Sequence, residues 1–393
     1  MKSAMKKIMP IMIGLLLAIT SLSSWAAYTC VPMAGYPRVD TVQLSPPSIS
    51  AGADIPLGTI IYQGQWQSGE TFARTVMCTT PIADTLWFNI GVFIRDAPLP
   101  LSNWSGSPFG GAVYQTAIPG IGVVITRRDN SMAATMGSPI IAFTTDQSYV
   151  TASAGEQPIL MANNKLNVLL IKTGQISPGS YTINASTLPT FGIDVINPIS
   201  HAAVAGLPVQ QNTIKLVGQL TVSTQTCTTP DVAVTLGSYE ISKYFKGISS
   251  VTPWIDASIS LTNCPVFHGF YDQNNLTTIF NYDTGTGSVA TSTNNRIGVR
   301  LTPVGNVMDA TNGIMEINST VPGAASGVGI QIGWGSSSQT PTPFNFAAEQ
   351  SVILTKDGSS TIRVPLAARY IQTNAAPTPG KADGKLTFTI SYY

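Results

Sequence analysis

Few residues in this chain have the side chains that enzymes use for proton transfer or nucleophilic attack. Its 393 residues contain 2 histidines, His201 and His268, and 19 aspartates and glutamates. Neither histidine lies in an HExxH pattern or near a GxSxG serine, and no glycine-rich loop leads from a strand into a helix. We therefore expect no enzymatic activity, no cofactor and no catalytic metal. A glycosidase-like pair of carboxylates is the alternative that one sequence leaves open.

The first 26 residues resemble a secretory signal. Lysines precede an apolar run, Ile8–Ile19, that is too short to cross a bilayer. Ser24 and Ala26 then fit the small-residue positions of a cleavage site. We expect a mature chain that begins near Ala27 and is exported, with a non-cleaved anchor as the alternative.

An exported chain meets an oxidising compartment, so its four cysteines should form disulfides. Four cysteines allow three pairings. Their spacing favours Cys30–Cys78 and Cys227–Cys264, one in each half of the chain. The absence of a CxxC pattern speaks against redox or zinc chemistry.

The charge content excludes several classes of partner. Charged residues make up only 10% of the chain, against about a quarter in a typical protein. The formal net charge is +1, and removal of the three signal-peptide lysines lowers it to −2. We therefore expect no nucleic-acid binding and no polybasic membrane patch.

Short alternating segments, separated by many of the 27 prolines and 35 glycines, predict an all-β protein. The predicted strands are 59–66, 86–94, 121–128, 167–173, 181–186, 215–223, 232–237, 257–263, 296–303, 327–334, 351–355, 361–371 and the final segment of the chain. The length fits two β-sandwiches. The Gly/Pro/polar segment 205–212 predicts a boundary near residue 211, within about ten residues, which divides the chain into a signal (1–26) and two domains (27–210 and 211–393).

The second half carries a specific combination of features. Gly380 is the fourteenth residue from the end, Tyr392 is a penultimate aromatic, and an Ala-Arg-Tyr segment (368–370) precedes the loop between them. The cysteine pair Cys227 and Cys264 flanks a "VTLG" segment. Together these features resemble the pilin domain of chaperone–usher fimbriae over most of residues 211–393.

The resemblance implies an immunoglobulin-like sandwich that lacks its last strand. The groove left open would be bordered by residues of the terminal strand and the loop before it: Leu386, Phe388, Ile390, Tyr392 and Gly380. A periplasmic chaperone would lend a strand first, and the next fimbrial subunit would replace it after passage through the outer-membrane usher. The alternative is a complete sandwich whose final strand happens to end the chain.

The first half suggests where such a subunit would sit. Only Ala27, Tyr28 and Thr29 precede Cys30 in the expected mature chain, and a donor strand needs five or six free residues. A subunit that receives a strand and donates none is expected at the fimbrial tip, on the bacterial surface. Segments 112–125 and 169–181 are similar to segments of two-domain tip adhesins, which implies a lectin-like receptor-binding sandwich in residues 27–210.

A glycan or matrix-protein receptor would need aromatic faces and short polar side chains on loops. The segment 95–111 has the densest such cluster, and we select Arg95, Asp96, Asn103 and Trp104 from it, with Trp66 as a further candidate. Phe109 lies in the same segment, and 127–131 is another candidate that also fits a solvated hairpin end. We expect Trp87 to be structural. The competing hypothesis is a minor subunit that caps or initiates the fibre without binding a receptor.

Overall fold

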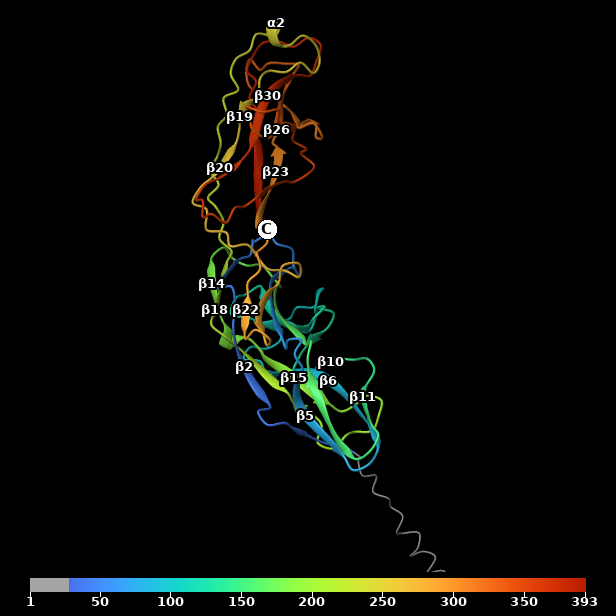
Figure 1. Cartoon of the computed structure of the whole chain (residues 1–393). Coiled ribbons are helices and arrows are strands. Elements are labelled where there is room, and N and C mark those ends of the chain that lie inside the picture. Colours follow the sequence, from blue (N-terminus) through green and yellow to red (C-terminus); the bar gives the residue numbers. More distant parts are fainter. Residues whose placement is uncertain (1–27) are drawn as a thin grey trace, which may run out of the picture.

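The computed structural model describes residues 28–393, so the signal expected in residues 1–26 lies outside the described residues. The described chain is almost entirely β, as expected, with only two helical turns, η1 (Ala185–Thr187) and α2 (Ile241–Tyr244). Figure 1 shows an elongated molecule with two stacked parts and the C-terminus at the junction between them. The immunoglobulin-like arrangement of the strands stays a prediction.

Two separate hydrophobic cores define these parts. The first core is built from residues between Tyr28 and Val222, with Tyr271 and Ile279 added from later in the chain. The second core is built from residues between Cys227 and Tyr392. We call the parts that surround them the N-terminal unit and the C-terminal unit.

Four sheets form the N-terminal unit. The first large sheet contains β10 (Ile140–Ile141), β6 (Asp84–Asp96), β15 (Thr190–Ile196), β17 (Asn212–Val217), β2 (Arg38–Gln43), β11 (Gln147–Thr151) and β16 (Val209–Gln210). The second large sheet contains β22 (Thr286–Ser288), β21 (Thr277–Asn281), β4 (Ile60–Gln67), β13 (Lys165–Lys172), β8 (Ile121–Arg127), β7 (Tyr114–Gln115) and β9 (Ala133–Ala134). The two small ones contain β1 (Thr29–Pro32), β5 (Ala73–Thr80) and β12 (Gly155–Met161), and β14 (Ser180–Asn184), β18 (Gln219–Ser223) and β3 (Ser48–Ser50).

Three sheets form the C-terminal unit. They contain β19 (Ile255–Asp256), β30 (Leu366–Gln372), β26 (Val328–Trp334), β25 (Ile314–Glu316), β24 (Val307–Asp309) and β27 (Thr342–Pro343); β20 (Ile259–Leu261) and β29 (Ile362–Val364); and β28 (Gln350–Ile353), β23 (Arg296–Pro303) and β31 (Leu386–Tyr392). The disulfides are Cys30–Cys78 and Cys227–Cys264, the two pairs that the spacing predicted.

The sequence of each strand reflects how many of its faces are covered. β13 reads KLNVLLIK and is buried along seven of its eight residues, because β4 and β8 flank it and core residues cover both faces. β31 reads LTFTISY and alternates between half-buried and exposed positions up to Ile390, so only one face is covered. Gly218, with φ of 87°, separates β17 from β18 within the single segment 215–223 that we expected as one strand.

The N-terminal unit contains strands that follow the expected boundary. β17 and β18 follow residue 211, yet they pair with β2 and β15 and with β3 and β14 of the N-terminal unit. The sheets of this unit therefore extend to Ser223. The boundary near residue 211 stays a prediction for the division into domains.

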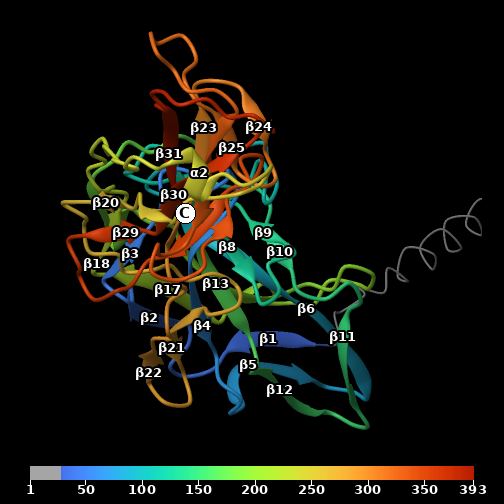
Figure 2. The ribbon, with the colours of Figure 1, turned by 90° about the horizontal axis from the view of Figure 1, so that it is seen from above.

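A later segment returns to the N-terminal unit. Residues 266–293, which we call the crossover segment, leave the C-terminal unit and carry β21 and β22. β21 runs parallel to β4, and Ile279 on it is buried in the first core. Figure 2 shows β21 and β22 beside β4 when the molecule is viewed from above. A segment that lies in the sequence between strands of the C-terminal unit therefore completes a sheet of the N-terminal unit.

Candidate functional site

A cavity of about 410 Å³ opens on the N-terminal unit between β6, β8, β11 and β12. Three aromatic rings form one side of it: Phe88 on β6, Tyr149 on β11 and Phe143 after β10. The Phe88 and Tyr149 rings stack with centroids 5.5 Å apart. Gln147 pairs with Phe88 in the β11–β6 ladder, and Tyr149, two residues further along β11, lies on the same face of the sheet. The cavity thus presents an aromatic wall whose position is set by two paired strands.

Polar and basic residues also line the cavity. Arg127 ends β8, and Arg128 and Asp129 continue into the turn. One guanidinium N–H of Arg127 donates to the Ala142 carbonyl at 2.5 Å, and its guanidinium carbon lies 5.3 Å from the Phe143 ring centroid. Burial, followed by the neighbouring Arg128, lowers the pKa of Arg127 from its ordinary value. The guanidinium nevertheless keeps free N–H donors beside the aromatic wall.

A buried amide network fixes the turn that carries these arginines. Asn130 adopts φ of 56°, which asparagine tolerates better than most residues. Its side chain donates to Gln63 Oε1 at 3.1 Å and accepts from Asn167 at 2.8 Å and from Thr126 at 2.6 Å. Gln65 continues the network by donating to Asn167 Oδ1 at 2.8 Å. The turn is therefore held by side chains from three strands and is a rigid support for a binding surface.

The neighbouring loop is anchored by Asp146. Its carboxylate accepts hydrogen bonds from the Ile199 and Ser200 N–H groups at 2.7 and 2.8 Å, and from Asn89. It also lies 2.8 Å from Nδ1 of His201, whose ring stacks on Trp87 with centroids 3.7 Å apart. Burial opposes ionisation, but these hydrogen bonds outweigh it and lower the pKa of Asp146 to about 2. Trp87 thus supports a loop, in keeping with the structural role expected for it.

Two of the receptor-binding candidates chosen from the sequence make contacts within the protein that leave little of their side chains for a ligand. Trp66 is fully buried in the first core, so the structure removes it from the residues that could contact a receptor. Its place on β4, between β13 and the crossover segment, accounts for the burial. Arg95 forms an ion pair with Asp194 and donates to the Asn212 carbonyl at 3.0 Å. It links β6, β15 and β17 and presents little free guanidinium to solvent.

The remaining candidates lie on the segment 95–111. Asp96 and Asn103 are exposed, whereas Trp104 is half-buried and its indole N–H donates to the Pro108 carbonyl at 2.8 Å. Trp104 and Phe109 pack on a small cluster that contains Val124. Val124 faces away from the first core, whereas its neighbours on β8, and by alternation Arg127, face toward it. The loop and the cavity therefore lie on opposite faces of one sheet.

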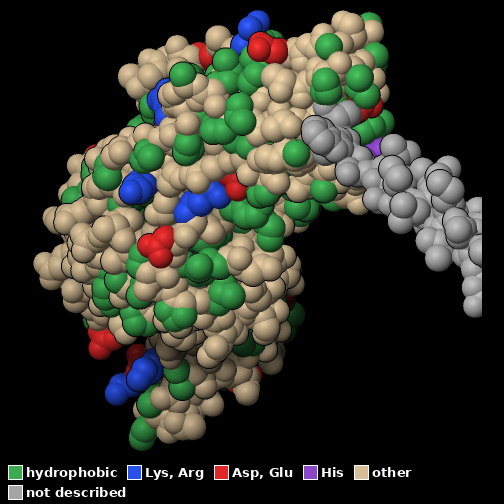
Figure 3. Space-filling model, turned by 90° about the horizontal axis from the view of Figure 1, so that it is seen from below, with side chains coloured by type: hydrophobic (Ala, Val, Ile, Leu, Met, Phe, Trp, Pro, Cys, Tyr) green, Lys and Arg blue, Asp and Glu red, His purple; other side chains and the backbone are tan. Residues whose placement is uncertain are grey.

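Sequence reasoning identified the segment 127–131 but not the cavity. Phe88 lies more than fifty residues before Phe143 and Tyr149 in the sequence, and no local pattern brings it to them. The only local signal was two consecutive arginines in a chain with few charges. Figure 3 shows that the face of the molecule seen from below is mostly uncharged, with only scattered Lys, Arg, Asp and Glu side chains.

The second candidate site is the free edge of the C-terminal unit. β31 is the last strand of its sheet and pairs only with β23. Leu386, Phe388 and Ile390 pack against the second core but are only half-buried. These are three of the five groove residues expected from the sequence, so the apolar side of β31 is incompletely covered.

The backbone of β31 also lacks partners on this edge. Arg296 and Tyr393 exchange hydrogen bonds of 3.0 and 2.9 Å, and in an antiparallel ladder every second residue faces the partner strand. Leu386, Phe388 and Ile390 therefore turn their N–H and C=O groups away from β23. Within residues 28–393 nothing bonds to these groups. An unpaired strand edge of this kind is a template for another strand.

A second unpaired segment runs beside β31. Residues 229–239 include the predicted strand 232–237, but that prediction is wrong: within the described chain they form no strand and their backbone makes no hydrogen bond. Cys227 at one end donates its N–H to the Tyr392 hydroxyl at 3.1 Å. At the other end, the ring centroid of Tyr239 lies 6.2 Å from that of Tyr370. The Tyr370 hydroxyl donates a hydrogen bond to the Ala382 carbonyl in the loop just before β31.

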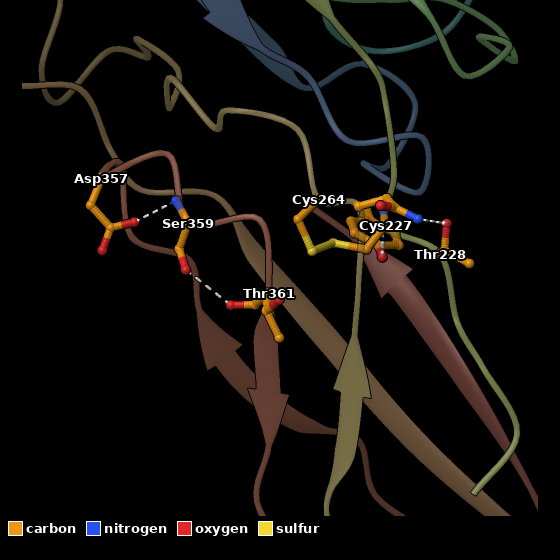
Figure 4. The surroundings of a disulfide bond; sticks show 8 residues. Cys227, Thr228, Cys264, Asp357, Ser359 and Thr361 are labelled. Atoms are coloured by element: carbon orange, nitrogen blue, oxygen red, sulfur yellow. Dashed lines mark hydrogen bonds between the residues drawn. A yellow bond between two sulfur atoms is a disulfide. The ribbon is translucent and has the colours of Figure 1, made fainter.

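The start of this segment is fixed by a disulfide. Cys227 is bonded to Cys264, and Thr228 pairs with Thr262, so the segment leaves from the end of β20 (Figure 4). Val232 and Val234 are 38% and 37% exposed, whereas Leu236 reaches the second core. Residues 229–239 thus have apolar side chains that are only partly covered, as β31 does.

The last two expected groove residues have identifiable contacts. Gly380 packs directly on the segment 323–326, where an added Cβ would lie 2.5 Å from the backbone N of Ala325. Tyr392 is buried, which raises its pKa. It closes the end of β31 that faces the N-terminal unit.

Within residues 28–393, no group of three or more His, Cys, Asp or Glu side chains is arranged to hold a metal ion. The same part of the chain has no helix that is both long and apolar enough to cross a membrane.

Comparisons with known proteins give matches of two kinds. A family model described as "Fimbrial protein" matches residues 214–393. The chain is 30% identical over 205 residues to "Fimbrial subunit type 1" of Salmonella typhimurium, which covers 49% of this chain and 91% of that protein.

Two solved structures are also similar. The CupB6 tip adhesin from Pseudomonas aeruginosa is 14% identical and covers 93% of this chain and 94% of its own, with a TM-score of 0.32. The receptor binding domain of the adhesin MrkD1P of Klebsiella pneumoniae is 18% identical and covers 51% of this chain and 98% of its own, with a TM-score of 0.29.

Proposed function

The chain belongs to the fimbrial protein family, and from this premise we propose that it is the tip adhesin of a chaperone–usher fimbria. Its C-terminal unit receives a strand from the next subunit, and its N-terminal unit binds a receptor on a host cell or surface. The observation that carries the proposal is that two segments of the C-terminal unit, the outer edge of β31 and residues 229–239, have backbone groups without partners in the described chain. In this proposal the fimbria places the protein on the bacterial surface after transit through the periplasm.

An added strand would satisfy the backbone groups of both segments. It would bond to the free backbone groups of Leu386, Phe388 and Ile390 on one side and to residues 229–239 on the other. Its apolar side chains would complete the cover of the second core. A periplasmic chaperone would supply this strand before assembly, the usher would mediate the exchange, and the next subunit would supply the strand in the fibre.

The position at the tip is supported by the first described strand. β1 pairs with β5 in its own unit, and Cys30 within it is tied to Cys78. Residues 29–32 are therefore not free to complete a neighbouring subunit. This supports a subunit that accepts a strand through its C-terminal unit while its N-terminal unit points away from the fibre.

Strand acceptance is tested with the full exported chain and a synthetic peptide that copies the donor segment of a fimbrial subunit. The peptide should bind and raise the melting temperature of the C-terminal unit. Phe388→Lys should abolish this effect, because it places a charge on the apolar side of β31. Thr389→Lys is the matched control, since Thr389 is exposed on the opposite side of the same strand. Strand acceptance is ruled out if the chain is a stable, soluble monomer that does not bind the peptide.

Receptor binding is assigned first to the cavity with its aromatic and polar walls, and second to the exposed residues Asn103 and Asp96 with Trp104. Glycans suit either surface, because aromatic faces contact sugar C–H groups and amides bond to hydroxyls. An array of glycans and matrix proteins, probed with the full chain, tests this role. If nothing binds, the protein is instead a structural subunit that caps or initiates the fibre. Weak binding at each tip would be strengthened by many fibres per cell.

A further inference from the structure

We propose that the cavity of the N-terminal unit recognises an acidic sugar, one that bears a carboxylate or a sulfate, through Arg127 and Arg128. This inference rests on the receptor-binding role proposed above and names the chemical class of the ligand. It starts from the placement of two guanidinium groups at the rim of a cavity with an aromatic wall.

Neither arginine has a carboxylate partner. The ion pairs among residues 28–393 involve Arg38, Arg95, His201, Arg296 and Arg363, and neither cavity arginine takes part in any of them. Arg127 donates to the Ala142 carbonyl, and Arg128 donates to the Asn163 carbonyl at 3.3 Å. Both contacts are with neutral oxygens, so they orient the side chains without an ion-pair contact to a carboxylate.

One acid lines the same cavity, and it is already engaged. Asp129 accepts hydrogen bonds from the N–H and hydroxyl of Ser131 at 3.1 and 2.8 Å. The cavity lining therefore carries two positive charges against one negative charge. A net positive cavity in a chain with so few charges indicates an anionic ligand.

The remaining lining groups suit a sugar ring. Tyr149 offers aromatic surface and is backed by the buried ring of Phe88, while Gln147, Asn163 and Asn164 offer amide donors and acceptors. A guanidinium binds a carboxylate or a sulfate through two parallel N–H donors. An acidic sugar would place its charged group against the arginines and its ring over the aromatic wall.

The rigidity of the turn strengthens the inference. Gln63, Asn167 and Thr126 hold the side chain of Asn130, which fixes the backbone of the turn that contains Arg128. A preformed arginine pair loses little conformational freedom when a ligand binds. A solvated hairpin end, the other interpretation of segment 127–131, would not need this buried network.

The test measures binding of the full exported chain to matched oligosaccharides. One set carries sialic acid or uronic acid, a second carries sulfate, and the controls are the same oligosaccharides with the carboxyl reduced or the sulfate removed. We expect at least one acidic form to bind about tenfold or more tightly than its neutral counterpart, since a charge-assisted hydrogen bond is worth roughly one such factor. Added salt should weaken this binding.

Variants identify the arginines. Arg128→Gln should weaken binding of the acidic sugar about tenfold, whereas Arg128→Lys should retain part of it. Arg127→Gln should also weaken binding of the acidic sugar. Arg127→Lys keeps both the charge and a donor to Ala142, so it shows whether a loss of binding in Arg127→Gln comes from the lost charge or from a failure to fold. The control is Lys215→Gln, which removes an exposed cation of the same unit outside the cavity and should leave binding unchanged.

The outcomes separate this inference from the proposed function. Loss of acidic-sugar binding in Arg128→Gln but not in Lys215→Gln supports it, and the preferred set shows whether carboxylate or sulfate is recognised. Equal binding of neutral sugars, or acidic-sugar binding that is unchanged in both Arg128→Gln and Arg127→Gln, overturns the inference and leaves receptor binding intact. A chain that binds no sugar and no matrix protein overturns both, while strand acceptance is judged by the separate peptide experiment.

Discussion

Asp54 of the N-terminal unit and Tyr392 of the C-terminal unit exchange two hydrogen bonds. The Asp54 N–H donates to the Tyr392 carbonyl at 3.0 Å, and the Tyr392 N–H donates to Asp54 Oδ2 at 2.8 Å. Tyr392 ends β31, the strand whose free edge we propose to accept a donor. The end of the acceptor strand is thus paired with a loop of the other unit at the junction shown in Figure 1.

Replacement of Asp54 should loosen this end of β31. Asp54→Ala removes the side-chain acceptor and leaves the Tyr392 N–H without its partner, at a cost of about 1–2 kcal/mol. Hydrogen exchange at the last residues of the chain should speed up, while exchange in β13 stays slow. Glu156→Ala, at an exposed position on β12, is the control and should change neither. Unchanged exchange at Tyr392 in Asp54→Ala would show that the pair does not hold this end.

The crossover segment predicts that a mutation late in the sequence destabilises the N-terminal unit. Ile279 is buried in the first core, so Ile279→Ala should lower the free energy of unfolding of that unit by about 2–4 kcal/mol. Calorimetry and the fluorescence of Trp66, buried in the same core, measure the change. Val289→Ala, an exposed position in the same segment, is the matched control. If only the C-terminal unit loses stability, the crossover segment does not stabilise the N-terminal unit.

Asp146 predicts a loss of stability in acid. Its hydrogen bonds lower its pKa from near 3.8 to about 2, so folding favours the ionised form. The stabilisation is complete above the ordinary pKa and disappears as the pH falls through the folded value. The difference in stability between the wild type and Asp146→Asn should therefore shrink between about pH 4 and pH 2. Urea unfolding across this range measures it.

The control for this titration is Glu156→Gln, which alters an exposed carboxylate on β12. Its effect on stability should stay small throughout. A difference between the wild type and Asp146→Asn that is constant from pH 5 to pH 2 would show that the carboxylate does not anchor residues 199–201 through its charge.

Trp104 distinguishes the two surfaces proposed for receptor binding. Its ring packs on a small cluster and its N–H bonds to Pro108, so Trp104→Ala should destabilise the loop by about 1–3 kcal/mol. If the cavity binds the receptor, affinity should be unchanged in Trp104→Ala and reduced in Arg128→Gln. The reverse result, with the fold intact by circular dichroism, would assign binding to the segment 95–111.

Several properties of this protein follow from local sequence alone. Alternating residues in segments such as 386–392 predict strands with one covered face, because side chains alternate across a strand. The cysteine spacing predicted both disulfides, since each pair closes a short loop within one half of the chain. The resemblance based on Gly380 and Tyr392 led to the fimbrial family that the comparisons support.

Other properties depend on contacts between distant residues, which no local pattern contains. Trp66 was a candidate for binding because of its polar neighbours, but β13 and the crossover segment bury it. Residues 232–237 have the composition of a strand, but a strand also needs a partner, and the described chain offers none. Local sequence specified the individual strands, whereas only the pairing of distant strands brought Arg127 to the Phe143 ring and left one edge of β31 open.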